Sequence, residues 1–185
     1  MSTNSSFTNF IDILVSKHPF LERSRDFFLD TFNQSGLSSI EIHPIKYGAA
    51  VSLGNRIVIS SNVINGNSLP LLFTIFHEIA HQFQYKKMGA EKMFKLYTGE
   101  LSPQEAIDFM RNVEIVADEY ATRKIRKMIS LGLIPKPMEV PQGFYKHYTD
   151  AQFNQIIKMI LQYLEGEDIS DPERISEIVF NKLKA

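Results

Sequence analysis

The sequence predicts an α+β fold that is mainly helical, and two observations lead to this prediction. Apolar residues recur at helical spacing, i, i+3 and i+4, over most of the chain. The stretch 39–60 differs, because it is rich in β-branched residues and contains a turn signal. No repeat, low-complexity tract or linker divides the sequence, so we expect its 185 residues to form one domain with a small β-hairpin or sheet.

Composition narrows the functional classes. Hydrophobic residues make up 44% of the chain and the formal net charge is -1, so charge gives no reason to expect nucleic acid or an anionic membrane as a partner. Cysteine is absent, which leaves His, Asp and Glu as candidate metal ligands. The first residues lack a leader pattern, and no segment approaches a membrane-spanning length. We therefore expect a soluble protein of the cytoplasm.

Two helices and a hairpin are predicted in the first third of the chain. Apolar spacing indicates helices over 7–15 and 20–32, which are separated before Pro19 because the residue preceding a proline resists the helical conformation. Gly36 is expected to end the second helix. The β-rich runs 49–53 and 56–60 flank Gly54-Asn55 and predict a hairpin, which is the only clear sheet signal. The polar stretch 62–68 is expected to be a loop.

The helices of the second half carry explicit boundary signals. Ser102-Pro103-Gln104-Glu105 is a capping box with a proline at the first helical position, and it predicts a helix to about Ile129. An irregular loop is expected over 132–143, because it is rich in proline and glycine. Similar start signals at Thr149 and Ser170 predict two further helices.

The motif H-E-x-x-H lies in an apolar stretch that reads as a buried helix. This helix is expected to run from about Leu71 to Met88, with Gly89 as its stop and a second helical stretch after it through residue 97. His77 and His81 would lie one turn apart on the same face, where two imidazoles can bind one Zn²⁺. Glu78, beside them, would accept a proton from a zinc-bound water as general base.

A hydrolytic zinc site needs a third protein ligand. The metzincin pattern would require glycine at Gln84 and histidine at Lys87, so that class is excluded. A glutamate from a later helix is the other common solution. The acidic candidates are Glu91, Glu100, Glu105, Asp108, Glu114, Asp118 and Glu119.

Helical phase favours Glu114 among these acids. Glu114, Ala117, Asp118 and Ala121 share one helical face, and the two alanines would allow a close approach to the motif helix. We predict that Glu114 binds the metal and that Asp118 accepts a hydrogen bond from the outer N–H of a ligating histidine. Glu119 points elsewhere. The alternative is an amphipathic helix whose acids are solvated.

At these residues the sequence resembles the gluzincin metallopeptidases, most closely the ImmA/IrrE-like group. The segment 73–81 is similar to that group's F-T-x-x-H-E-x-x-H pattern, and 114–121 to its E-x-x-A-[ND]-x-[FY]-A helix. The resemblance implies a zincin-like metallopeptidase domain over 1–185, with core motifs in 45–130 and a helical extension over 132–185. It also implies Zn²⁺ as cofactor, Glu114 as third ligand and a protein or peptide as substrate.

The resemblance is incomplete in three respects. The gap between the two motifs is long, at 114 − 81 = 33 positions from His81 to Glu114. The group's usual Leu-Met-Pro ending is missing soon after the second motif, and the flanks carry no recognisable helix-turn-helix unit, which often accompanies members of the group. Without such a unit, we expect no direct binding of nucleic acid. The near-neutral charge and the short apolar segments likewise give no reason to expect a membrane partner.

Thermolysin-like sites also use a His or Tyr to stabilise the oxyanion. The candidates here are Tyr120, Tyr145, His147 and Tyr148, although each is more often a packing residue.

Three functional classes remain open from the sequence. The first is a zinc-dependent endopeptidase that acts on a protein substrate. The second is a regulatory or protein-binding module that keeps a zinc-peptidase fold but cleaves little. The third is a helical interaction module with an accidental motif. The zinc-dependent endopeptidase is the leading interpretation, and the pairing of His77, His81 and Glu114 favours the first two classes over the third, because chance rarely provides a complete ligand set.

Overall fold

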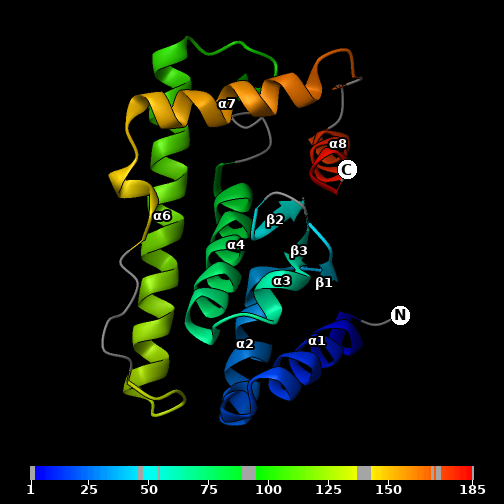
Figure 1. Ribbon diagram of the computed structural model, residues 1–185, viewed down its shortest axis with the longest axis vertical. Helices are drawn as coiled ribbons and strands as arrows, with labels where there is room; N and C mark the ends of the chain where they lie inside the picture. Colours follow the sequence, from blue (N-terminus) through cyan, green and yellow to red (C-terminus); the bar gives the residue numbers. More distant parts are fainter. Residues whose placement is uncertain are drawn as a thin grey trace.

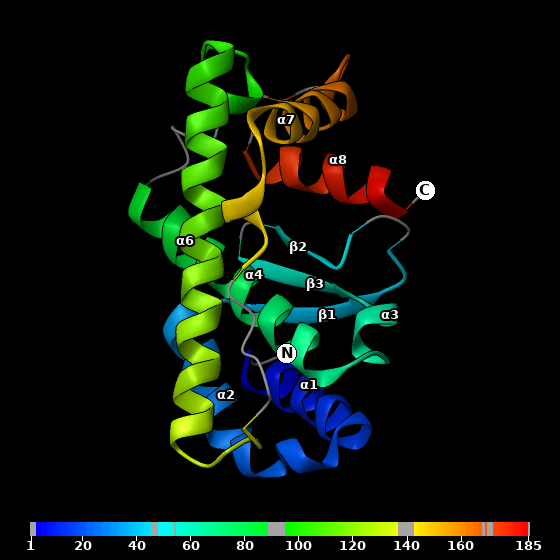
Figure 2. The same ribbon diagram turned by 60° about the vertical axis from the view of Figure 1, so that its left-hand side comes forward.

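Two long helices, α4 (Ser68–Met88) and α6 (Pro103–Ser130), pack side by side, with α6 along one edge of the molecule (Figure 1 and Figure 2). Figure 1 shows the computed structural model, which describes residues 3–45, 48–53, 55–88, 95–136, 143–167, 169 and 172–184. Ala117 and Ala121 of α6 are fully buried and Ala80 of α4 nearly so. These small side chains let the two helix backbones approach closely, as the sequence predicted.

The chain begins with three helical segments that pack against α4 and the sheet. They are α1 (Thr3–Lys17), the 3-10 helix η1 (Pro19–Ser24) and α2 (Arg25–Ser35). The prediction of one continuous helix over 20–32 was wrong, because a proline-initiated 3-10 segment precedes the α-helix. Ser24, at the junction, is buried and its hydroxyl donates a hydrogen bond to the carbonyl of Leu133 at 3.3 Å. Gly36 ends α2 at φ +73°, as predicted.

The sheet has three strands in the order β1-β3-β2. They are β1 (Ser39–His43), β2 (Ala50–Leu53) and β3 (Arg56–Ser60). The predicted hairpin is confirmed, since β2 pairs antiparallel with β3 and Val51 lies opposite Val58. β1 pairs parallel with the other side of β3, which the sequence did not indicate. A short helix, α3 (Ser61–Ile64), directly follows β3 where a loop was expected.

The two faces of the sheet contact different parts of the molecule. Ile57 and Ile59 are buried in the main core, together with Ile40 of β1. Val58 lies between Ile57 and Ile59 in sequence and therefore points to the other face of the sheet. There it belongs to a small apolar cluster, against which Leu183 of α8 (Pro172–Lys184) packs. Figure 2 shows the strands between α1 and α8, with α8 beside β2.

Both predicted capping boxes are present. The Ser102 hydroxyl accepts a hydrogen bond from the Glu105 amide, and Thr149 forms the same arrangement with Gln152 at the start of α7 (Asp150–Leu164). A 3-10 helix, η2 (Tyr145–His147), precedes α7. Three predicted features rest on residues outside the described part of the chain. They are the glycine of the hairpin turn at Gly54, the helix stop at Gly89 and the helix start at 170–171. Within the described part of the chain, no helix is long and apolar enough to cross a membrane.

A cluster of phenylalanine rings sets the orientation of α4. Phe76 stacks on Phe28 of α2, with ring centroids 6.0 Å apart, and Phe28 in turn contacts Phe32 at 5.9 Å. All three side chains are fully buried. Because successive residues of a helix point about 100° apart, seating Phe76 in this core directs the neighbouring His77 toward α6.

Candidate metal centre

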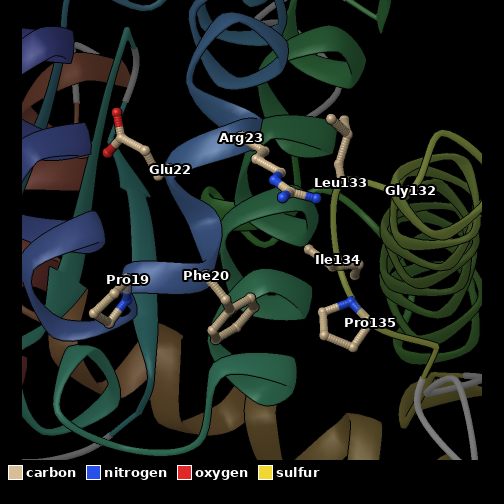
Figure 3. Close-up of a pocket in the computed structure, with 8 residues that line it drawn as sticks. All are labelled: Pro19, Phe20, Glu22, Arg23, Gly132, Leu133, Ile134 and Pro135. Atoms are coloured by element: carbon tan, nitrogen blue, oxygen red, sulfur yellow. The ribbon is translucent and has the colours of Figure 1, made fainter.

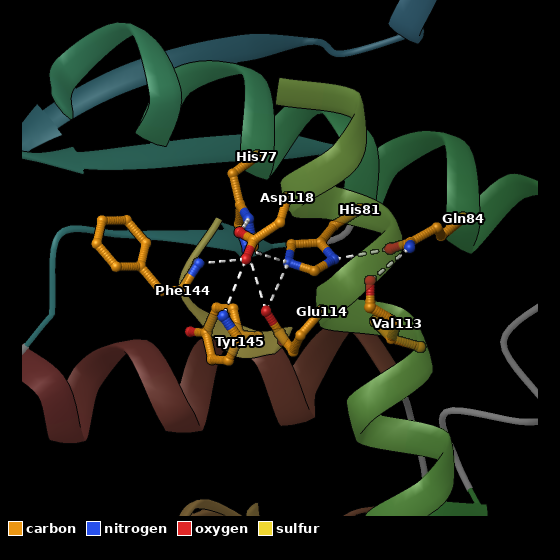
Figure 4. Close-up of polar contacts among 8 residues, drawn as sticks. All are labelled: His77, His81, Gln84, Val113, Glu114, Asp118, Phe144 and Tyr145. Atoms are coloured by element: carbon orange, nitrogen blue, oxygen red, sulfur yellow. Dashed lines mark hydrogen bonds and ion pairs between the residues drawn. The ribbon is translucent and has the colours of Figure 1, made fainter. Parts of the chain in front are cut away.

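His77 and His81 lie on consecutive turns of α4, and Glu114 faces them from α6 (Figure 4). The two Nε2 atoms are 3.1 Å apart. Oε2 of Glu114 lies 3.0 Å from Nε2 of His77 and 3.7 Å from Nε2 of His81. Among the described residues, these three side chains form the group whose ligand atoms converge closely enough to hold one metal ion.

The size of this triangle fits a tetrahedral zinc site. Zinc bonds to nitrogen and oxygen of about 2.0–2.1 Å place neighbouring ligand atoms roughly 3.3–3.4 Å apart at tetrahedral angles. The three separations in this group, 3.0, 3.1 and 3.7 Å, lie on both sides of that value. Three protein ligands of this kind leave a fourth position for water, which is the arrangement of catalytic zinc sites.

The outer nitrogen of each histidine ring has its own hydrogen-bond partner. Nδ1 of His77 lies 3.0 Å from Oδ1 of Asp118, and Nδ1 of His81 lies 2.8 Å from Oε1 of Gln84. Gln84 is held in turn, because its side-chain amide donates to the carbonyl of Val113 at 2.7 Å. These contacts orient both rings with Nε2 toward the centre. The sequence predicted the position of Asp118 but missed Gln84, whose spacing of three residues from His81 was the available signal.

Glu78 is buried beside the histidines and is held by strand β2. The backbone amide of Ser52 donates a hydrogen bond to its carboxylate, and the hydroxyl of Ser52 accepts one from Gln82. Burial raises the pKa of Glu78, and the nearby His81 and His77 only partly oppose this effect. A carboxylate with a raised pKa is a stronger base, which suits it to accept a proton from water.

Charge in the centre is balanced between His77 and two carboxylates. Burial lowers the pKa of His77, but hydrogen bonds to Asp118 and Glu114 outweigh it and raise the pKa to about 10. Burial raises the pKa of Glu114, yet His81 and His77 lower it below its usual range. Without a metal the group is thus a cationic imidazole between anionic oxygens, and a divalent cation would replace that proton.

Tyr145 is the one candidate for oxyanion stabilisation that the structure brings to this group. Its ring stacks on His77 with centroids 5.6 Å apart and an interplanar angle of 27°. Burial, together with the negative charges of Glu114 and Glu78, raises the pKa of the Tyr145 phenol. The hydroxyl therefore stays protonated near neutral pH and can donate a hydrogen bond.

The other three candidates lie elsewhere. Tyr148 packs against the Tyr145 ring at 5.0 Å and against Phe153 of α7. His147 is exposed. Tyr120 packs against Phe83 at 5.6 Å. Apolar packing explains the positions of Tyr148 and Tyr120, whereas the sequence alone could not choose among the four side chains.

The remaining acidic candidates for a third ligand have other partners or point to solvent. Glu105 belongs to the capping box, and Asp108 accepts from Gln104 at 2.9 Å. Glu100 accepts a hydrogen bond from Thr98 at 2.8 Å. Glu119 is exposed, in agreement with its helical phase. Glu91 lies outside the described residues.

A cavity of about 520 Å³ lies away from His77, His81 and Glu114, between η1 and the segment 132–135 (Figure 3). Its volume would admit a small ligand. Its lining is mainly apolar, with Glu22 and Arg23 as its charged residues, and it includes no histidine. No catalytic set converges among these lining residues.

Comparisons with protein-family models, curated proteins and solved structures find no match to this chain.

Proposed function

We propose that this protein is a zinc-dependent metallopeptidase of the gluzincin type, related to the ImmA/IrrE-like group, that hydrolyses peptide bonds of a protein substrate. The observation that carries the proposal is the convergence of His77, His81 and Glu114 in a triangle of zinc-site size, with Glu78 beside it. Under this proposal the protein works in the cytoplasm, which fractionation of cells that produce it would test.

The residues around the triangle have complementary roles in such a reaction. When bound, a zinc ion would supply Lewis-acid chemistry by lowering the pKa of a water molecule and polarising the substrate carbonyl. Glu78 accepts the proton of the attacking water and passes it to the leaving amine nitrogen. The Tyr145 hydroxyl donates a hydrogen bond to the carbonyl oxygen as negative charge develops on it. Asp118 keeps the His77 ring oriented.

A second candidate is a regulatory or protein-binding module that keeps the zinc site but cleaves little. The covered state of the site supports it, because the His77 and Glu114 side chains are only 9% and 14% exposed. Tyr145 also stacks over His77. A zinc site that only holds α4 and α6 together would have the same ligands. The two candidates differ in turnover alone.

Metal analysis and cleavage together test the proposal. We expect one zinc per purified chain, and loss of that zinc in a His77→Ala variant. Incubation with a peptide library, followed by mass spectrometry, should show cleavage by the wild type and none by Glu78→Gln, because the amide lacks the basicity to activate water. The Glu78→Gln protein should retain its zinc and its fold.

Glu119→Gln is the matched control, since it makes the same change at an exposed acid of α6. It should cleave like the wild type. Wild-type protein without stoichiometric zinc would refute both candidates. Zinc in the wild type, with no cleavage above the Glu78→Gln background, would favour the second.

A further inference from the structure

One carboxylate connects the metal-binding group to a segment far along the chain. Oδ1 of Asp118 lies 3.0 Å from Nδ1 of His77. Oδ2 of the same residue accepts hydrogen bonds from the backbone amides of Phe144 and Tyr145, at 2.6 and 2.9 Å (Figure 4). Asp118 is 3% exposed. Bonds between amides and a buried carboxylate are charge-assisted and stronger than neutral ones, so this contact holds the segment 143–148, hereafter the strap, in place.

Gly143 shows that this docking requires a particular backbone. Its φ is +97°, and a Cβ at this position would lie 2.5 Å from Oδ2, 2.7 Å from Cβ and 2.8 Å from Cγ of Asp118. The aspartate is bonded at both oxygens, so it has little freedom to move aside. A side chain at residue 143 would therefore both strain the backbone and push the strap away from Asp118.

The strap covers the metal-binding group with aromatic rings. Tyr145 stacks on His77, and Phe144 meets the edge of Phe73 with centroids 5.5 Å apart. Tyr145 also stacks on Phe153 of α7, with ring centroids 6.2 Å apart. The ring of Phe144 is otherwise largely free, because the residue is 60% exposed. The docked strap therefore depends on Asp118 and on the Tyr145 ring.

We propose that Asp118 fastens the strap 143–148 over the metal-binding group, and that a polypeptide substrate reaches the metal only after these two hydrogen bonds break. Asp118 is then a positioning residue for His77 throughout and for Tyr145 while the strap is docked, so Tyr145 can donate to the substrate carbonyl only once the strap docks again over the bound peptide. A peptide must bring its carbonyl to the fourth position on the metal, yet the Tyr145 ring packs against His77, and the His77 and Glu114 side chains are only 9% and 14% exposed. The substrate class this favours is an unfolded or extended segment that can displace the strap. The inference rests on the proposed function where it concerns the metal and the polypeptide substrate, whereas the docking of the strap on Asp118 does not depend on it.

Hydrogen exchange at two amides tests the docking without any metal. We expect the amides of Phe144 and Tyr145 to be protected in the wild type. In Gly143→Ala their exchange, corrected for intrinsic rates, should be faster by roughly 5–30-fold, the factor that corresponds to the cost of a left-handed alanine. Gly132→Ala is the matched control, because Gly132 has φ +68° but nothing within 4 Å of its added Cβ.

The control should leave both amides protected. Unchanged exchange in Gly143→Ala, or equally fast exchange in Gly132→Ala, would overturn the docking by Asp118. The exchange experiment gives an answer even if the protein binds no zinc. A negative result would therefore contradict the docking of the strap without contradicting the proposed function.

Zinc release tests whether the strap covers the metal. Gly143→Ala keeps every ligand, so it should still bind one zinc per chain but lose it to an excess of a chromogenic chelator roughly 5–30-fold faster than the wild type. Tyr145→Ala removes the ring over His77 and should also speed release, which gives a second reading if Gly143→Ala folds poorly. Wild-type release rates in both variants would overturn the proposed closure over the metal.

Discussion

Glu114 is the residue whose assignment follows most directly from helical geometry. Its phase on α6 predicted a position facing His77 and His81, and its carboxylate lies 3.0 and 3.7 Å from their Nε2 atoms. We expect Glu114→Ala to weaken zinc binding most strongly, because a ligand is lost. Asp118→Ala should weaken it by about 10–100-fold, as loss of a partner of a ligating histidine does. Competition with a chromogenic chelator would measure both affinities.

Glu119 provides the control for this series. It neighbours Asp118 in sequence but is exposed, so Glu119→Ala should bind zinc like the wild type. A Glu114→Ala protein with wild-type affinity would remove Glu114 as the third ligand.

The charge of His77 makes zinc binding depend on pH. Its pKa in the metal-free protein is raised to about 10, whereas an unfolded histidine titrates near 6.5. The resulting stabilisation of the metal-free fold is fully present below about pH 6.5 and is lost as pH rises through about 10. A zinc-bound imidazole must be neutral. At pH 7 to 8 zinc should therefore release a proton from His77, and its affinity should fall as pH falls.

Calorimetry would measure this proton release. The apparent enthalpy of zinc binding at one pH should vary with the ionisation enthalpy of the buffer, in proportion to the protons released. Enthalpies that are equal in phosphate-like and amine-like buffers, after correction for zinc–buffer complexes, would contradict a protonated His77.

At the scale of elements, the close packing of α4 on α6 sets the distance from the histidines to Glu114. Ala117 is fully buried at this contact, one turn from Glu114. Ala117→Leu should force the helices apart, which costs about 1–3 kcal/mol of unfolding free energy and weakens zinc binding because Glu114 moves with α6. Chemical denaturation and zinc competition would measure the two effects.

Val116→Leu is the matched control for this substitution. Val116 is the neighbouring residue of α6 and is 40% exposed, so its replacement should change the unfolding free energy by no more than about 0.5 kcal/mol. Normal zinc affinity in Ala117→Leu would show that the helix contact does not position Glu114.

Local signals predicted the starts of α6 and α7 well. Ser102 with Glu105 and Thr149 with Gln152 act within one turn, so their meaning is readable from adjacent residues. The hairpin was predictable for the same reason. The pairing of β1 was not predictable. Its parallel neighbour in the sheet, β3, comes after β2 in the sequence, and this pairing is decided by packing on the core. The 3-10 start of the second helical region likewise depends on tertiary contacts such as that of Ser24 with Leu133.

Across the whole molecule, the candidate site combines parts that sequence could predict and parts that it could not. His77, His81, Glu114 and Asp118 follow from spacing on two helices, because a helix fixes which residues share a face. Tyr145 comes from a segment whose docking depends on a long-range contact with Asp118. Sequence could name Tyr145 as one of four candidates, but only the fold distinguishes it from the other three.

Zinc binding should stabilise the entire fold, since its ligands join α4 to α6 and Asp118 joins both to the strap. A ligand that binds only the native state adds about 2.7 kcal/mol at a free concentration one hundred times its dissociation constant. For a domain of this size each kcal/mol raises the melting temperature by about 2–4 °C, so the shift should be on the order of 5–11 °C. Far-UV circular dichroism would record it, because the chain has no tryptophan.

The shift must depend on the ligands if it reports this site. Excess chelator should reverse it in the wild type, and His77→Ala should melt at the same temperature with and without zinc. Glu78→Gln should keep the full shift, because Glu78 acts on water and is not one of the three ligands. A wild-type melting temperature that neither zinc nor chelator changes would mean that α4 and α6 hold no metal between them, and the convergence of His77, His81 and Glu114 would then be a salt-bridged core contact.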